Sequence, residues 1–141
     1  LDEYELADGA ARYEYWEFSH ASWLGLGAAV DVALDLGVGR IQATIASRAA
    51  ELRSSLGAAG MGVHDDGIAK CGIVTATHPT LESADVVARL RDQAINTSST
   101  FLGSARADME ARALPSMVRF SVHCTTTSDE IDRTITAVSA L

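Results

Sequence analysis

One arginine occupies a position where its charge needs an explanation. Arg119 lies in the alternating run from Met117 to Val122, whose apolar residues predict a strand with one buried face. A guanidinium group does not lose its proton, so Arg119 must face water or pair with an anion. Because its planar donors bind a carboxylate through two parallel hydrogen bonds, Arg119 is a candidate ligand-binding residue. The alternative is an arginine that pairs with a structural carboxylate.

The histidines and cysteines do not show the spacing of a metal site. His123 and Cys124 are adjacent, and in a continuing strand their side chains would point to opposite faces, so we expect His123 to be structural. The histidines at positions 20, 64 and 78 share no ligand spacing, and we predict no metal. Cys71 and Cys124 lie in apolar runs, which favours buried free thiols in a reducing compartment, with a disulfide between them as the alternative.

Two other groups of charged residues have simple explanations. Asp65 and Asp66 form a carboxylate pair, but a turn next to Gly67 accounts for them without chemistry. Arg106 and Arg112 precede the Arg119 strand in what we expect to be a loop. There they would either meet an acidic substrate or a neighbouring subunit, or remain solvated.

The elements that must position these residues are predicted from periodicity. Helical patterns span residues 22–36 and 38–56, with Gly37 as a C-cap between them. The order helix, helix, strand, strand, helix, strand, strand, helix indicates a small two-layer α+β domain, with helices packed on a mostly antiparallel sheet. The strands are expected within residues 61–67, 70–78, 95–100 and 117–122, and the later helices at 83–94 and from 127 onward.

Local signals indicate how these helices begin and which faces they bury. Ser83 is the expected N-cap of the third helix, and Thr127 with Glu130 forms a capping box for the last one. We expect the apolar first helix to be buried, with Gly25 and Gly27 admitting the close approach of another backbone. The buried faces are expected to comprise Ile41, Ile45, Ala49, Leu52 and Leu56 in the second helix, Val86, Val87 and Leu90 in the third, and Ile131, Ile135 and Val138 in the last.

Length and charge exclude several classes of protein. A chain of 141 residues suits one domain, and 48% hydrophobic residues suffice for a core. The net charge of −8, from 11 basic and 19 acidic residues, argues against nucleic-acid binding. No signal peptide is visible and no apolar run reaches membrane-spanning length, so we expect a cytoplasmic protein without membrane contact.

Several linked motifs together resemble one known region. In order they are ARYEYWE, LGLGAAVDVALDLGVGRI, CGIVT, INTSST and LPSMVRFSVHCTTTSDEID, and they cover roughly residues 11 to 141. They resemble the C-terminal small domain of class V aminotransferase-fold enzymes, which use pyridoxal phosphate. Within that group they are most similar to the branch that contains hercynylcysteine sulfoxide lyase and isopenicillin-epimerase-like proteins.

The resemblance implies a role for the chain within a larger enzyme. Arg119 would bind the α-carboxylate of an amino-acid substrate, and the cofactor lysine would lie in a large domain of the same polypeptide, because Lys70, the only lysine, does not match it. Residues 1–17 would be an arm from that large domain and residues 18–141 the small domain. No residue of this chain would then be catalytic, and the chain alone would be inactive. The whole protein is expected to be a homodimer that performs C–S cleavage, epimerisation or transamination.

The sequence departs from the family pattern in three places. Relatives often have His-Tyr-Tyr-Asn-Thr where this chain has His123 to Thr127, so contacts of those tyrosines and that asparagine do not transfer. Glu17 stands near a threonine that reaches the cofactor phosphate in desulfurases, and a carboxylate would repel that phosphate. The segment 100–115 has no cysteine where desulfurases carry theirs, which argues against a persulfide-forming desulfurase.

Two other interpretations stay open. The chain could be a stand-alone interaction or ligand-binding module, in which the aromatic segment from Ala11 to Ser22 and the first helix dock onto a partner. Arg119 would then bind an anionic ligand or nothing. The chain could also belong to a pseudoenzyme that kept the fold and lost the lysine.

Overall fold

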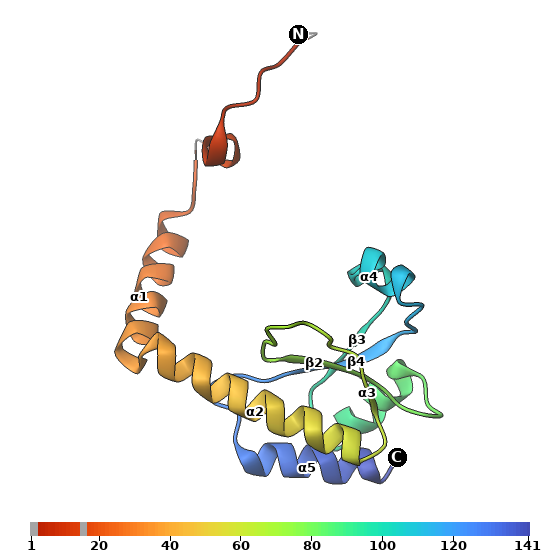
Figure 1. Ribbon diagram of the computed structural model, residues 1–141. Coiled ribbons are helices and arrows are strands. Elements are labelled where there is room, and N and C mark those ends of the chain that lie inside the picture. The colour runs from red at the N-terminus through yellow and green to blue at the C-terminus, as the bar shows by residue number, and fades with distance from the viewer. Residues whose placement is uncertain (1–2, 15–16) are drawn as a thin grey trace. The chain divides into compact units, whose positions relative to one another are not determined.

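The computed structural model describes residues 3–14 and 17–141 (Figure 1). Tyr15 and Trp16 of the ARYEYWE motif, and the first two residues of the predicted arm, lie outside the described residues. Contacts within the chain divide it into two units, Leu1–Gly37 and Val38–Leu141. The predicted boundary at residue 17 between an arm and a domain stays a prediction.

Among its described residues, the first unit contains one long helix. A 3-10 helix, η1 (Gly9–Tyr13), precedes α1 (His20–Leu36). The Ser19 side chain caps α1 by accepting a hydrogen bond from the Ser22 amide at 3.2 Å. Gly37 ends the helix with a φ of 85°, a left-handed conformation that favours glycine, as the sequence predicted.

The expectation that α1 is a buried helix is wrong for this chain. None of its residues is buried, and Leu24 is 78% exposed. Apart from the adjoining residues and the helix's own backbone, no described atom lies within 4 Å of the Cβ position at Gly25 or Gly27. Apolar composition predicted burial, but the rest of the described first unit supplies only η1 and extended chain, which cannot cover a helix of 17 residues. Its Phe18 and Trp23 rings do contact each other, with centroids 5.1 Å apart.

Among the described residues, no single helix has both the length and the apolar composition of a membrane span. Helix α1 and the next helix, α2 (Val38–Ala58), pass that test only when they are taken together.

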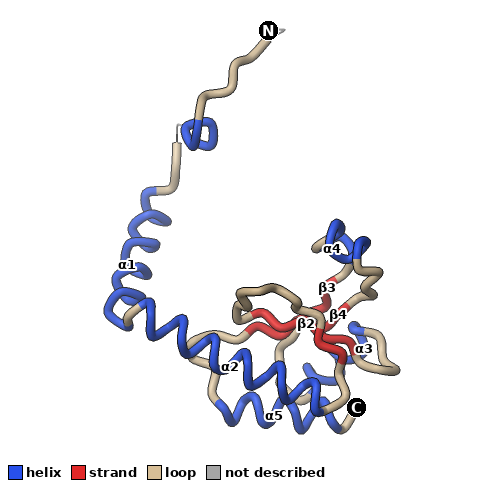
Figure 2. The backbone as a smooth tube through the Cα atoms, viewed as in Figure 1, coloured by secondary structure: helices blue, strands red, loops and turns tan. Residues whose placement is uncertain are grey.

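The second unit is a four-stranded antiparallel sheet covered by helices on one face. Its elements are α2 (Val38–Ala58), β1 (Gly62–Val63), β2 (Ile73–Thr77), α3 (Ser83–Asp92), β3 (Ser98–Thr100), η2 (Leu102–Ser104), α4 (Arg106–Ala111), β4 (Met117–Ser121) and α5 (Ser128–Ser139). The strand order is β1-β2-β4-β3, and each neighbouring pair is antiparallel. Figures 1 and 2 show α2 running alongside α5 against the sheet, with α4 lying apart from these two.

This architecture confirms the predicted two-layer α+β fold and the predicted order of its main helices and strands. The structure adds the short helix α4 within a segment that was expected to be a loop. Six residues of helix are too short to show an amphipathic period in the sequence, which explains the difference.

The core lies between the sheet and helices α2, α3 and α5. Val118 and Phe120 of β4 are 0% and 4% exposed and belong to it. In α2 the predicted face is buried only in its second half, because Ile41 and Ile45 line an open pocket of about 420 Å³. The core also includes Ala49, Leu52, Leu56, Val74, Ala76, Val86, Val87, Leu90, Ile131, Ala137 and Val138.

One predicted helix start is wrong and one is confirmed. The N-cap of α3 is Glu82, because the amides of Asp85 and Val86 both donate to the Glu82 carbonyl. Ser83 is instead the first helical residue, and it is buried. In α5 the capping box is present: the Thr127 Oγ1 accepts from the Glu130 amide at 3.2 Å, and the Glu130 carboxylate accepts from the Thr127 amide at 2.8 Å.

Candidate anion-binding face of the sheet

Arg119 lies on the face of the sheet opposite the core. It is exposed in β4, between the buried residues Val118 and Phe120, as its alternating sequence predicted. It pairs in register with Thr75 of β2 and with Ser98 of β3. Because directly paired residues share a face of the sheet, the arginine has a hydroxyl-bearing neighbour on each side.

His64 extends this line of residues to the fourth strand. Its backbone amide donates to the Thr75 carbonyl at 2.9 Å, which continues the pairing of β1 with β2 by one residue. Its ring Nε2 lies 2.9 Å from the Thr77 Oγ1, so its side chain is on the same face as Thr77 and Thr75. We call the four residues that cross the sheet on this face the cross-strand row: His64, Thr75, Arg119 and Ser98.

Both carboxylates of the loop after His64 are paired with arginines. The Asp65 carboxylate accepts a hydrogen bond from the Arg53 guanidinium, whose other nitrogen donates to the Cys71 carbonyl at 2.7 Å. The Asp66 carboxylate lies 2.9 Å from the Arg112 guanidinium. Both aspartates of the predicted turn therefore have a structural role as partners of arginines. One Asp65 oxygen is buried without a described partner.

Arg112 connects α4 to the edge of the sheet. Its guanidinium donates to the His64 carbonyl at 2.6 Å, to Asp66, and to Asp108 of α4 at 3.2 Å. Arg112 is only partly exposed, so it is not a solvated loop charge, whereas Arg106 is 71% exposed and lies 3.6 Å from Glu110. Within residues 3–14 and 17–141, no ion pair or hydrogen bond engages the Arg119 side chain.

The other predicted residues do not join this row. Strand β4 ends at Ser121, so the argument that His123 and Cys124 point to opposite faces of a strand was wrong. The Cys124 sulfur instead lies 3.3 Å from the His123 Nδ1. Both cysteines are free, but Cys71 is exposed and Cys124 is half-buried, which corrects the prediction of buried thiols. Cys71 lies in the loop before β2 rather than in the strand itself.

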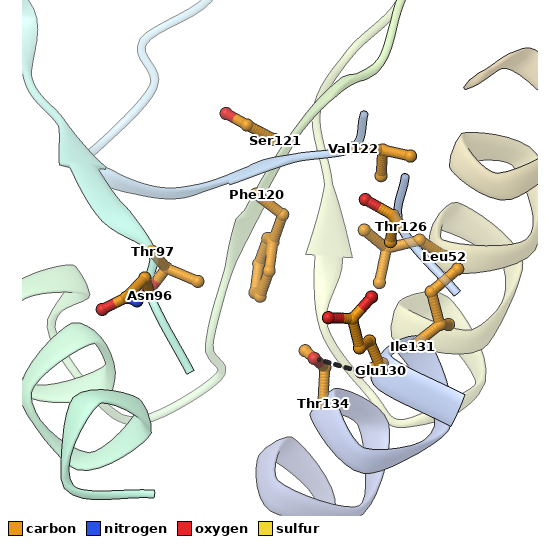
Figure 3. A pocket seen from close by; sticks show the side chains of 10 residues that line it. All are labelled: Leu52, Asn96, Thr97, Phe120, Ser121, Val122, Thr126, Glu130, Ile131 and Thr134. Atoms are coloured by element: carbon orange, nitrogen blue, oxygen red, sulfur yellow. Dashed lines mark hydrogen bonds between the residues drawn. The ribbon is translucent and has the colours of Figure 1, made fainter. Parts of the chain in front are cut away.

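A separate cavity lies on the helix side of the sheet. Figure 3 shows side chains from α2, β4 and α5 around it, including Leu52, Phe120 and Ile131. Its volume of about 80 Å³ is small beside the roughly 300–1,000 Å³ of typical small-molecule sites. Arg119 does not line it, and we place the candidate site on the open face. In the part of the chain that the structure describes, no group of three or more metal-ligating side chains could hold a metal ion.

Sequence reasoning missed His64 as a member of this face. It treated the histidine only as one of several without ligand spacing. The signal that could have found it is alternation, because Gly62 and His64 stand two residues apart opposite the alternating β2 residues Thr75 and Thr77. Pairing these two stretches requires the register of β1 against β2, which the sequence alone does not specify.

Comparison with known proteins finds one family and several similar folds. The model of the aminotransferase class-V family matches residues 1–134. An apo cysteine desulfurase from Thermococcus onnurineus NA1 superposes with a TM-score of 0.84 at 22% identity, over 99% of this chain and 35% of that one. The cysteine desulfurase CsdA from Escherichia coli, in its S-sulfonic acid form, gives a TM-score of 0.78 at 16% identity, over 92% of this chain and 32% of that one.

A third solved structure, described as a NifS-like protein, gives a TM-score of 0.66 at 16% identity, over 80% of this chain and 31% of that one. The chain thus spans about a third of the length of the solved structures that it matches. A comparison with curated proteins finds no match.

Proposed function

The chain belongs to the class V aminotransferase family, and from that premise we propose that it binds the substrate carboxylate for a pyridoxal-phosphate enzyme that acts on an amino acid. The observation that carries this proposal is the position of Arg119. It is exposed on the open face of the sheet and engages no carboxylate among the described residues. A charged donor in that situation is available to an anion from outside the chain.

The strand that carries Arg119 suits the task of orienting a substrate. β4 is paired on both sides, with β2 and with β3, so its backbone is fixed by two ladders of hydrogen bonds. A guanidinium on such a strand holds a carboxylate in one plane through two parallel hydrogen bonds. The hydroxyls of Thr75 and Ser98 flank it and offer further donors.

The residues of this chain do not fit the cofactor itself. Lys70, the only lysine, is exposed in the loop before β2 and lines a pocket whose other members include the apolar Val38, Ile41 and Ile45. That pocket offers no second cation to a phosphate group. We therefore assign the cofactor to a large domain of the same polypeptide, with residues 1–17 as the arm that leads to residues 18–141, and we assign no catalytic residue to this chain.

The whole protein is proposed to be a cytoplasmic homodimer, and its free cysteines suit a reducing compartment. The reaction is proposed to be C–S cleavage, epimerisation or transamination, in the branch that contains hercynylcysteine sulfoxide lyase and isopenicillin-epimerase-like proteins. A persulfide-forming reaction is not favoured, because residues 100–115, the segment with α4, contain no cysteine.

Replacing Arg119 tests the carboxylate site directly. Arg119→Gln should weaken the binding of an α-amino acid about tenfold to a hundredfold, because a charge-assisted pair is lost. Titration of the protein with L-alanine, followed by amide chemical shifts, measures this. Arg106→Gln is the matched control, since it removes an exposed arginine that pairs only within α4. Equal affinity in Arg119→Gln and the parent protein would rule out the proposal.

A second candidate function is an interaction module, and the exposed apolar helix α1 favours it. The intact mass and the visible absorbance of the protein as expressed from its gene separate the two. A mass well above 14.9 kDa, with an absorption band that borohydride removes, supports the cofactor enzyme. A mass of 14.9 kDa with no such band after addition of pyridoxal phosphate supports the module. The longer mass without the band supports a pseudoenzyme.

A further inference from the structure

We propose that His64 is a second recognition point on the Arg119 face and that the site takes an amino acid with an acidic side chain. Arg119 would hold the α-carboxylate, and His64 would hold the carboxylate at the other end of the ligand. This inference rests on the proposed function, because it assumes that Arg119 binds the α-carboxylate.

The first argument is the spacing within the cross-strand row. His64 and Arg119 are separated by Thr75 alone, that is, by two strand spacings or about 10 Å of backbone. The Thr75 side chain is short and half-buried, so it leaves space above the sheet between the two longer side chains. The arginine side chain is long enough to span part of this distance. The remaining gap suits a short ligand with an acceptor group at each end.

The second argument is that the His64 side chain is held in place. Its Nε2 lies 2.9 Å from the Thr77 Oγ1, and its backbone carbonyl accepts a hydrogen bond from Arg112 at 2.6 Å. When the Thr77 hydroxyl donates to Nε2, the other ring nitrogen carries the hydrogen. That nitrogen, Nδ1, has no partner in the described part of the chain and is the atom that would donate to the ligand.

Glycine at position 62 makes this arrangement possible. A Cβ at Gly62 would lie 2.8 Å from the Thr77 Oγ1 and 3.3 Å from the His64 Nε2. Any side chain there would push the imidazole and the hydroxyl apart. Gly62→Ala therefore disturbs the histidine without removing it.

The third argument is charge. The carboxylates that follow His64 in the chain, Asp65 and Asp66, are paired with Arg53 and Arg112. The cross-strand row itself contains no carboxylate. A basic substrate side chain would find no counter-charge in the row, whereas an acidic one would find an imidazole donor.

The experiment compares two ligands that share a five-carbon skeleton, L-glutamate and L-norvaline, since only the first has a second carboxylate. The dissociation constants are measured from amide chemical shifts. The parent protein should prefer glutamate about tenfold, the value of one hydrogen bond to a charged group. His64→Ala and Gly62→Ala should both remove the preference, so that each variant binds glutamate and norvaline with similar affinity. His20→Ala, in the first unit, is the control and should change neither.

The outcomes distinguish a failure of the role proposed for His64 from a failure of the proposed function of Arg119. A glutamate preference that persists in His64→Ala, or no preference in the parent protein, overturns the role of His64. Neither result contradicts the proposal that Arg119 binds the α-carboxylate. If Arg119→Gln alters neither affinity, the proposed function is wrong, and the inference about His64, which rests on it, is wrong as well. Should either variant fail to fold, Thr77→Val removes the hydroxyl partner with little change of shape, and a preference equal to that of the parent protein then counts against the proposal.

Discussion

At the scale of single residues, the register of β4 decides whether Arg119 is available to a ligand. Arg119 is exposed because Val118 and Phe120, on either side of it, face the core. A slip of one residue against β2 would turn the guanidinium into the core and the two apolar side chains into water. Burying that charge without a partner costs far more than the sheet could offset. The core of this domain therefore also fixes the face on which its candidate site lies.

Gly72 is a second residue whose identity the packing dictates. A Cβ there would lie 2.5 Å from the Val122 carbonyl oxygen and 2.7 Å from the Ile45 Cγ2. The Gly72 carbonyl also accepts from the Val122 amide at 2.7 Å, so the two strands cannot separate without losing a bond. We expect Gly72→Ala to lower the free energy of unfolding by about 1–3 kcal/mol, measured by urea denaturation.

The matched control for that variant is Gly57→Ala. Gly57 lies in α2, and apart from the adjoining residues and the helix's own backbone no described atom lies within 4 Å of its Cβ position. Alanine there should raise the free energy of unfolding by about 0.5–1 kcal/mol through helix propensity. If both variants shifted stability in the same direction, the close contact at Gly72 would not be the cause.

At the scale of elements, the capping box of α5 should make the stability of the domain depend on pH. The pKa of the Glu130 carboxyl is lowered from 4.5, chiefly by the hydrogen bond from the Thr127 backbone amide and next by that from the Thr127 side chain. A carboxyl with a lower pKa in the folded state contributes its full stability above the unfolded pKa. That contribution is lost as the pH falls through the folded value.

Glu130→Gln should therefore lower the free energy of unfolding at pH 7 and should have a smaller effect at pH 3. Urea denaturation of the variant and the parent protein at both pH values measures the difference. Asp132→Asn, which changes an exposed carboxylate of α5 outside the capping box, is the control. An effect of Glu130→Gln that is as large at pH 3 as at pH 7 would show that the carboxylate charge is not what stabilises the start of α5.

At the scale of the whole chain, stability and exposed apolar surface belong to different units. Every core residue lies between Ala49 and Val138, within the unit Val38–Leu141. The described residues of the unit Leu1–Gly37 contribute none to the core. In α1 the side chains of Trp23, Leu24 and Leu34 are exposed. An apolar helix of this kind is typical of a surface that is covered in a larger assembly.

A protein that begins at Val38 should therefore fold by itself. Its free energy of unfolding should match that of the 141-residue chain within about 0.5 kcal/mol, because none of the described side chains that it loses is buried. Its solubility should rise with the loss of α1. Urea denaturation and light scattering of both proteins check these outcomes, and a large loss of stability would mean that the first unit packs on the core.

Local patterns in the sequence predicted a large part of this domain. The element order, the Gly37 C-cap, the Thr127–Glu130 capping box and the exposure of Arg119 all follow from residues within one turn or one strand of each other. Such signals depend on neighbours along the chain, so they can be identified from a single sequence. The linked motifs extended this to the family, which the match over residues 1–134 supports.

What only the tertiary structure decided depends on distant residues. The exposure of α1 and Cys71, the burial of Ser83 and the pairing of Asp66 with Arg112 each reflect which other element is, or is not, nearby. The placement of His64, Thr75 and Arg119 in one row is also decided by distant residues, because strand register pairs segments that are tens of residues apart. The sequence by itself therefore determined which residues could face solvent on a strand, and the sheet decided which of them face it together, since hydrogen-bond register is a property of pairs of strands.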